Sequence, residues 1–156
     1  MRIKKIVEKY LHRSKEVRRE MIGYDIWMHS VIVKELLAPG QFDWETSRKV
    51  LADVQAFAAG QKLKNDGTDE EKADVAQVIA MLEERMFKHN MWRCTVATRK
   101  LCSDDGFNRD EYFTTWAEVI GIAESKWLKE YGTAKQKQDV YKLIDRLEGL
   151  RTASCG

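Results

Sequence analysis

The chain has 156 residues, of which 44% are hydrophobic and 33% charged, and its formal net charge is +2. This length and composition are typical of one globular domain with a sizeable core, and they exclude a disordered chain. The net charge is too small to indicate a dedicated nucleic-acid binder, which usually has a stronger basic bias. No uncharged apolar run approaches the roughly 18 residues that a membrane span needs, so we expect no membrane partner.

Three cysteines, Cys94, Cys102 and Cys155, are an odd number, and they lack the spacing of a metal-binding motif. Such a set is typical of free thiols in a reducing compartment. The N-terminal residues 1–13 carry charges throughout and contain no continuous apolar core of a signal peptide. We therefore expect a cytoplasmic, intracellular protein that needs no cofactor.

Helices are the only regular structure that the sequence supports, because Pro39 is the only proline and strand-like alternation is almost absent. We expect residues 1–156 to form a single all-α domain, a helical bundle of five or six helices with two long central helices. No internal repeat or flexible linker is evident. The expected helices cover residues 2–13, 17–37, 44–59, 69–101 and 109–131, followed by a last helix from Thr133 to a frayed tail at 152–156.

Capping residues support several of these boundaries. Asp43 and Asn108 are good N-caps before apolar-periodic stretches. The segment 61–68 is expected to be a polar loop, and the basic helix over 2–13 is expected to end near residues 12–16 and to be able to project from the domain. Two further helix starts have the spacing of a capping box, Thr68 with Glu71 and Thr133 with Gln136.

The second expected helix is strongly apolar, yet it carries Asp25 and His29 one helical turn apart. At 100° per residue both fall on its apolar side, opposite a polar side that includes Gly23 and Ser30. Arg18 lies seven residues before Asp25 and falls in the same line. Polar groups in such positions are stable only when they are paired and hydrogen-bonded, so this helix predicts buried polar contacts.

The helix expected over 69–101 repeats this feature, since His89 and Arg93 fall on its apolar side together with Val96. We expect one buried polar network made of Arg18, Asp25, His29, His89 and Arg93. Three of these residues, Asp25, His29 and His89, are also candidate ligands for an open three-ligand metal site. A structural network is favoured over a metal, because the second helix lacks the Glu-x-x-His repeats of bundle metalloproteins.

The segment DEEKADVAQVIAML, which begins at Asp69, resembles the second metal-binding helix of the MazG-like nucleotide pyrophosphatases. The resemblance covers about fourteen residues, and it implies that Glu71 and Asp74 bind magnesium. That family also uses an earlier Glu-x-x-Glu helix, which this chain lacks. The alternative interpretation is a capped first helical turn, where acidic residues are favoured by the helix dipole.

The helix expected over 109–131 has a large aromatic stripe, which predicts a core-facing side before it predicts any binding role. The stripe consists of Tyr112, Phe113, Trp116, Val119, Ile120, Ala123 and Trp127.

The N-terminal residues 1–19 contain eight Lys or Arg against two acids, Glu8 and Glu16. A basic helical face of this kind can lie along phosphates or along an acidic protein surface. We expect Lys4, Lys5, Lys9 and Arg13 to form a partner-binding surface.

These patterns favour a small regulatory or inhibitory protein that binds a larger macromolecular partner, most readily a protein, and has no chemistry of its own. One alternative is a nucleic-acid-associated helical protein that uses its basic N-terminal helix. A third interpretation is a metal-dependent all-α enzyme. Self-association into a homo-oligomer stays open, and no catalytic residue is assigned.

Overall fold

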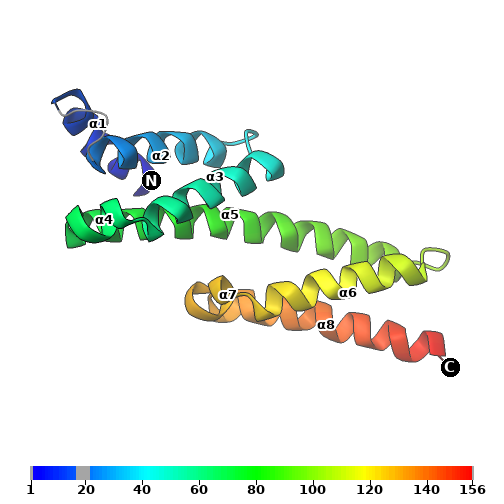
Figure 1. Ribbon diagram of the computed structural model, residues 1–156. Helices are drawn as coiled ribbons and strands as arrows, with labels where there is room; N and C mark the ends of the chain where they lie inside the picture. Colours follow the sequence, from blue (N-terminus) through cyan, green and yellow to red (C-terminus); the bar gives the residue numbers. More distant parts are fainter. Residues whose placement is uncertain (1, 17–21, 156) are drawn as a thin grey trace. The chain divides into compact units, whose positions relative to one another are not determined.

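The computed structural model describes residues 2–16 and 22–155, and of residues 12–16 and 153–155 it describes the backbone alone. Every regular element in the described part is a helix, which confirms the predicted all-α class. Figure 1 shows the helices in chain order. They are α1 (Arg2–Glu16), α2 (Ile22–Leu37), α3 (Trp44–Ala59), α4 (Gln61–Asp66), α5 (Asp69–Leu101), α6 (Arg109–Glu124), α7 (Lys126–Tyr131) and α8 (Ala134–Cys155).

The described residues form eight helices, whereas the sequence predicted five or six. The segment expected to be a polar loop contains α4, and the helix expected over 109–131 is divided at Ser125 into α6 and α7. The first helix continues through the predicted break at 12–16, and the last continues into the predicted frayed tail. Of the helix expected over 17–37, residues 17–21, Arg18 included, lie outside the described residues.

The predicted caps are confirmed. Asp43 accepts a hydrogen bond from the backbone N–H of Thr46 at 2.8 Å, and Asn108 accepts one from that of Glu111 at 3.1 Å. Ser125 explains the unexpected division of the aromatic helix. Its hydroxyl donates to the carbonyl of Ile122 at 2.8 Å and accepts from the N–H of Leu128 at 3.3 Å, so it ends α6 and caps α7.

The chain forms two compact units, residues 1–86 and residues 87–156, and each has its own hydrophobic core. The core of unit 1 includes Ile3, Tyr10, Ile26, Val54 and Leu82. The core of unit 2 includes Phe87, Cys94, Tyr112, Val119 and Leu147. The single domain expected from the sequence stays a prediction.

The same order of elements occurs twice, once in residues 22–86 and once in residues 87–151. In each copy a helix of 16 residues (α3, α6) is followed by a break and a helix of 6 residues (α4, α7). A glycine and a Thr capping box come next, at Gly67 and Thr68 in the first copy and at Gly132 and Thr133 in the second. Corresponding residues are therefore 65 positions apart, as Gly132 is from Gly67.

Residues agree between the two copies as well as elements, so the chain contains an internal repeat, and the prediction of no repeat is wrong. Several identical pairs are buried in both copies: Leu36 and Leu101, Val54 and Val119, Leu63 and Leu128, Val75 and Val140, and Leu82 and Leu147. Other identical pairs are Trp27 and Trp92, Val31 and Val96, Phe42 and Phe107, and Asp74 and Asp139.

The two glycines of the repeat have a clear steric role. A Cβ atom at Gly67 would lie 2.5 Å from the carbonyl oxygen of Leu63, and one at Gly132 would lie 2.5 Å from that of Leu128. Both contacts are too short for any residue with a side chain. Each glycine N–H instead donates to that same carbonyl oxygen, which ends the short helix.

Helix α1 lies outside the repeat and belongs to unit 1, where it packs closely against α2. Its apolar side is fully or almost fully buried at Ile3, Ile6, Val7 and Tyr10. The element that precedes the second copy in the chain is the first half of α5, which already serves unit 1 as the last helix of the first copy. The helix that ends the first copy therefore continues without a break into the helix that begins the second copy.

Candidate functional site

The two polar residues predicted to point inward from α2 are half-buried. Asp25 pairs with Lys62 of α4, with 2.9 Å between the carboxylate and the ammonium nitrogen, and the ring of His29 lies 5.4 Å from that of Phe57 in α3. Burial lowers the pKa of His29, and the carboxylates of Asp25 and Asp53 partly offset this effect. The structure thus gives Asp25 a lysine partner that the sequence did not predict.

The opposite side of α2 was predicted to be polar and exposed, and this is wrong, because Gly23 and Ser30 are both buried. Helices α3 and α4 contact the side with His29 and Asp25, and α1 is the other helix that packs against α2. We therefore assign the burial of Gly23 and Ser30 to α1. The Ser30 hydroxyl is satisfied within the helix, where it donates to the carbonyl of Ile26 at 2.6 Å.

Helix α5 changes its buried stripe between the two units. The stripe of unit 1, Val75, Val78, Leu82 and Met86, would continue at the same spacing through His89, Arg93, Val96 and Lys100. In unit 2 the buried positions are instead Phe87, Cys94, Thr98 and Leu101. The prediction of an inward Arg93 and Val96 is therefore wrong: both are exposed, and His89 is half-buried. The reason is the repeat, since α5 is the last helix of one copy and the first helix of the next.

No group of three or more His, Cys, Asp or Glu side chains in the described residues is placed to hold a metal ion. The pair implied by the pyrophosphatase resemblance has other contacts. Glu71 accepts from the N–H of Thr68 at 2.9 Å in a capping box, and Asp74 accepts from the Tyr10 hydroxyl at 2.6 Å.

The residues of the predicted basic surface of α1 have different environments in the structure. Lys9 forms ion pairs with Glu70 and with Asp74, the second at 2.7 Å, and these hydrogen bonds raise its pKa. Lys4 and Lys5 are exposed, as predicted for a contact surface, whereas the side chain of Arg13 lies outside the described residues. Lys9 thus joins α1 to α5 within unit 1.

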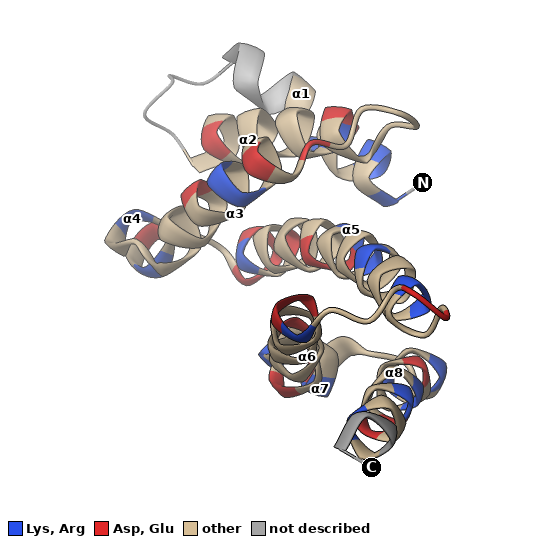
Figure 2. Cartoon of the chain, turned by 90° about the vertical axis from the view of Figure 1, so that its right-hand side faces the viewer, with Lys and Arg blue, Asp and Glu red and all other residues tan. Residues whose placement is uncertain are grey.

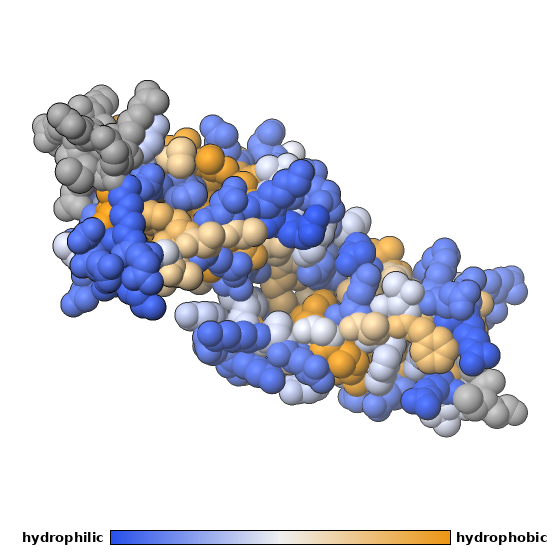
Figure 3. Space-filling view, in the orientation of Figure 1, coloured by the Kyte–Doolittle hydropathy of each residue, from blue (hydrophilic) through white to orange (hydrophobic). Residues whose placement is uncertain are grey.

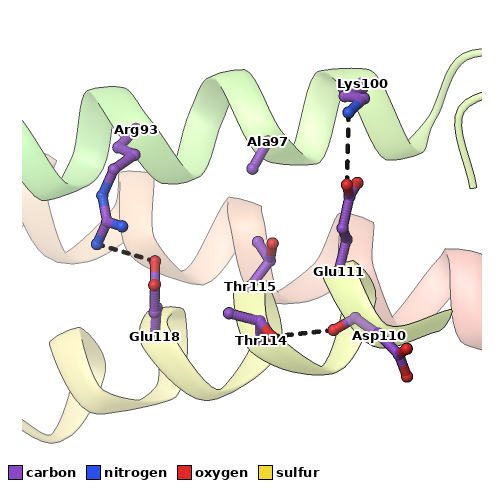
Figure 4. Close-up of a pocket in the computed structure, with 8 residues that line it drawn as sticks. All are labelled: Arg93, Ala97, Lys100, Asp110, Glu111, Thr114, Thr115 and Glu118. Carbon is purple, nitrogen blue, oxygen red and sulfur yellow. Dashed lines mark hydrogen bonds and ion pairs between the residues drawn. The ribbon is translucent and has the colours of Figure 1, made fainter. Parts of the chain in front are cut away.

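A groove of about 410 Å³ lies between the second half of α5 and α6, within unit 2 (Figure 4). Two ion pairs cross it, Arg93 to Glu118 at 3.1 Å and Lys100 to Glu111 at 3.5 Å. Ala97 lies between these pairs on the α5 wall. The corresponding residue of the first copy is Ile32, which packs against the core of unit 1, so the smaller alanine leaves space in unit 2.

The groove has no activated thiol. The buried Cys94 thiol donates to the Glu118 carboxylate at 3.6 Å, and burial together with that carboxylate raises its pKa to about 11. The thiol therefore stays protonated at neutral pH and is a poor nucleophile. The groove presents two pairs of opposite charges with the small apolar side chain of Ala97 between them.

Two apolar residues of α5 that directly precede the groove residues Arg93 and Ala97 in the chain are exposed: Trp92, at 64%, and Val96 one turn further on. Their counterparts in the first copy, Trp27 and Val31, are partly buried against the core of unit 1. The exposed pair is called the Trp92 surface below. Sequence reasoning missed it because it assigned Val96 to the buried stripe and did not compare the two copies.

The aromatic stripe of α6 and α7 is confirmed only in part. Tyr112, Val119 and Trp127 are buried, and Trp116 is partly buried against the same core, but Phe113 is exposed beside Arg109. Thr115, which is not part of the predicted stripe, is buried as well.

Hydrophilic side chains cover most of the face in Figure 3, and apolar groups lie among them.

No protein-family model, no curated protein and no solved structure matches this chain. None of the helices in the described residues is long and apolar enough to cross a lipid bilayer.

Proposed function

We propose that this chain is a small regulatory or inhibitory protein that binds a larger protein through the Trp92 surface. The observation that supports this proposal is the exposure of Trp92 and Val96 in unit 2, set against the partial burial of Trp27 and Val31 in unit 1. Trp is enriched among the few residues that supply most of the binding energy in protein interfaces.

The charges around this surface favour a protein over a nucleic acid. The groove of unit 2, whose α5 wall includes Arg93 and Lys100, also contains Asp110, Glu111 and Glu118. Phosphates would be repelled by the carboxylates, whereas a protein surface can supply both signs of charge. Figure 2 shows Lys and Arg interspersed with Asp and Glu along α5, α6 and α8.

The exposed Lys4 and Lys5 support a second candidate, nucleic-acid association through α1. It has less support, because Lys9 is paired with Glu70 and Asp74 of the acidic start of α5. A measured loss of affinity with salt would identify phosphate contacts. A shallow salt dependence would favour the protein partner.

The test is capture of a partner from a lysate of the native host, followed by affinity measurements with the purified partner. Trp92→Ala is expected to weaken binding by about 30-fold, which corresponds to about 2 kcal/mol. Its unfolding midpoint should stay close to that of wild type, because the side chain is exposed.

Tyr131→Ala is the matched control, since Tyr131 is 57% exposed on α7. It should leave the affinity unchanged. Equal affinities for the Trp92 and Tyr131 variants would reject the Trp92 surface as the binding site.

A further inference from the structure

The way α1 is held in unit 1 defines a helix-binding face made of α2 and the first half of α5. Tyr10 is completely buried, and its hydroxyl donates to Asp74 at 2.6 Å. Lys9 pairs with Glu70 and Asp74. The small buried residues Gly23 and Ser30 allow α1 and α2 to approach closely, since the side chains at the contact set the distance between two helices.

The second copy of the repeat has the corresponding face, made of the second half of α5 and of α8, and it has no counterpart of α1 in the chain order. Its residues, called the α5–α8 face, are Lys88, Met91, Thr95, Lys135 and Asp139, which correspond to Gly23, Ile26, Ser30, Glu70 and Asp74.

The α5–α8 face is more exposed than the corresponding face of unit 1, as expected if no helix takes the place of α1 on it. Ile26 and Ser30 are buried, whereas Met91 and Thr95 are half-buried. The Asp74 side chain is 13% exposed, and the Asp139 side chain is 39% exposed. Met91 and Thr95 thus retain a surface that α1 covers in unit 1.

The charges on the α5–α8 face indicate which helix would fit. Lys135 replaces Glu70, and Lys88 replaces Gly23, so this face is more basic than the face that holds α1. Lys135 pairs with Asp139 of the same helix at 3.2 Å, so a carboxylate at the position of Lys9 would be a second acidic partner for this lysine. The bound helix can retain a Tyr hydroxyl for Asp139. Helix α1 of a second copy would place Lys9 beside Asp139 and Lys135, whereas in unit 1 it meets the two carboxylates of Asp74 and Glu70. This occupant would exchange one ion pair for a repulsion, so charge favours an acidic helix over it.

We propose that the α5–α8 face binds an amphipathic helix of the protein partner with an acidic residue facing Lys135. This helix lies along the face as α1 does in unit 1, but further from α5, because Lys88 stands where α2 has Gly23. This proposal rests on the proposed function and specifies the chemistry of the partner. It makes Trp92, which is four residues after Lys88 on α5, a neighbour of the bound helix. Unit 2 is then a repeat unit completed by a helix in trans.

Two synthetic peptides test the proposal with the full chain. One has the 15-residue sequence of α1, and the other has the same sequence with Lys9→Glu. Amide shifts of the isotope-labelled protein report where each peptide binds. The acidic peptide should bind about fivefold more tightly than the native one, which corresponds to about 1 kcal/mol for an exposed ion pair. The shifts should lie in residues 88–96 and 135–142.

Charge reversal of the protein supplies the control. Lys135→Glu should invert the order of the two peptides. The Lys135 side chain is 83% exposed, so the variant should stay folded, and a thermal scan checks this. Lys126→Glu on α7 changes an equally exposed lysine, at 85%, and should leave the order as in wild type.

Three outcomes would overturn the proposal: equal affinity for both peptides, shifts confined to residues 22–86, or self-association of the chain that Lys135→Glu abolishes, which would identify a second copy as the occupant. The captured partner separates this proposal from the proposed function. Loss of its binding with Trp92→Ala but not with Lys135→Glu would retain the Trp92 surface and reject the helix-binding face.

Discussion

Tyr10, Lys9 and Asp74 carry most of the polar connection between α1 and α5. The Tyr10 ring is completely buried, and Asp74 accepts both the hydroxyl and the Lys9 ammonium. Bonds to a charged acceptor are stronger than neutral ones, and they fix the orientation of a helix whose remaining contacts are apolar. One carboxylate therefore determines how α1 lies in unit 1.

His29 gives unit 1 a pH dependence. Its pKa in the folded chain is lowered from 6.5, so the unfolded chain takes up a proton first as the pH falls. The stability that neutral His29 supports is complete above about pH 6.5 and declines as the pH falls through that value towards the folded pKa. We expect His29→Gln to lose less stability than wild type between about pH 7.5 and pH 5 in urea unfolding. Parallel pH profiles for the two proteins would contradict this prediction.

At the scale of elements, the repeat's glycines and one solvent-exposed glycine should respond in opposite ways to the same substitution. Gly132→Ala would place a Cβ atom 2.5 Å from the Leu128 carbonyl, so it should lower the free energy of unfolding. Gly121 lies inside α6 with no atom within 4 Å of an added Cβ, and Gly121→Ala should raise it by about 0.5 to 1 kcal/mol through helix propensity. Thermal unfolding of both variants measures the difference, and equal shifts would show that the Gly132 turn is adaptable.

Helix starts were predictable from the sequence, because a capping residue acts on N–H groups within three residues of itself. Asp43 and Asn108 illustrate this. The division at Ser125 was not predictable in the same way, since serine is also common inside helices and only its bond to the Leu128 N–H shows the break. The stripe of α5 could not be predicted either, because a helix shared by two cores has no single apolar side.

The candidate site was largely beyond a sequence-based prediction for a related reason. Arg93 was identified as unusual, and it does line the groove, but its partner Glu118 belongs to another helix. Asp25 was likewise singled out, and its partner Lys62 comes from a helix that was expected to be a loop. Contacts of this kind depend on packing between elements, which local spacing does not contain.

At the scale of the whole molecule, the two cores should respond separately to equivalent cavities. Leu82 and Leu147 are corresponding residues of the repeat, and neither is exposed. Leu82→Ala and Leu147→Ala should each cost about 2 to 5 kcal/mol. Hydrogen exchange should show the loss of protection mainly in residues 22–86 for the first and in residues 87–151 for the second. Loss across both ranges in either variant would indicate one cooperative core.

The repeat also changes how the basic N-terminus is interpreted. Helix α1 supplies the first copy with a covering helix, and this internal role accounts for Lys9 and for the buried side at Ile3 and Tyr10. The second copy has no such helix in the chain order, and its exposed Trp92 belongs to α5, one of the two helices of the corresponding face. We therefore propose that unit 2, and not α1, binds the partner.

Hydrogen exchange of the full chain with and without its captured partner tests this assignment most directly. We expect new protection in residues 88–96 of α5 and in residues 135–142 of α8, with little change in α1. Protection concentrated in residues 2–11 of α1, with α5 and α8 unchanged, would contradict the account and return the binding site to the basic helix.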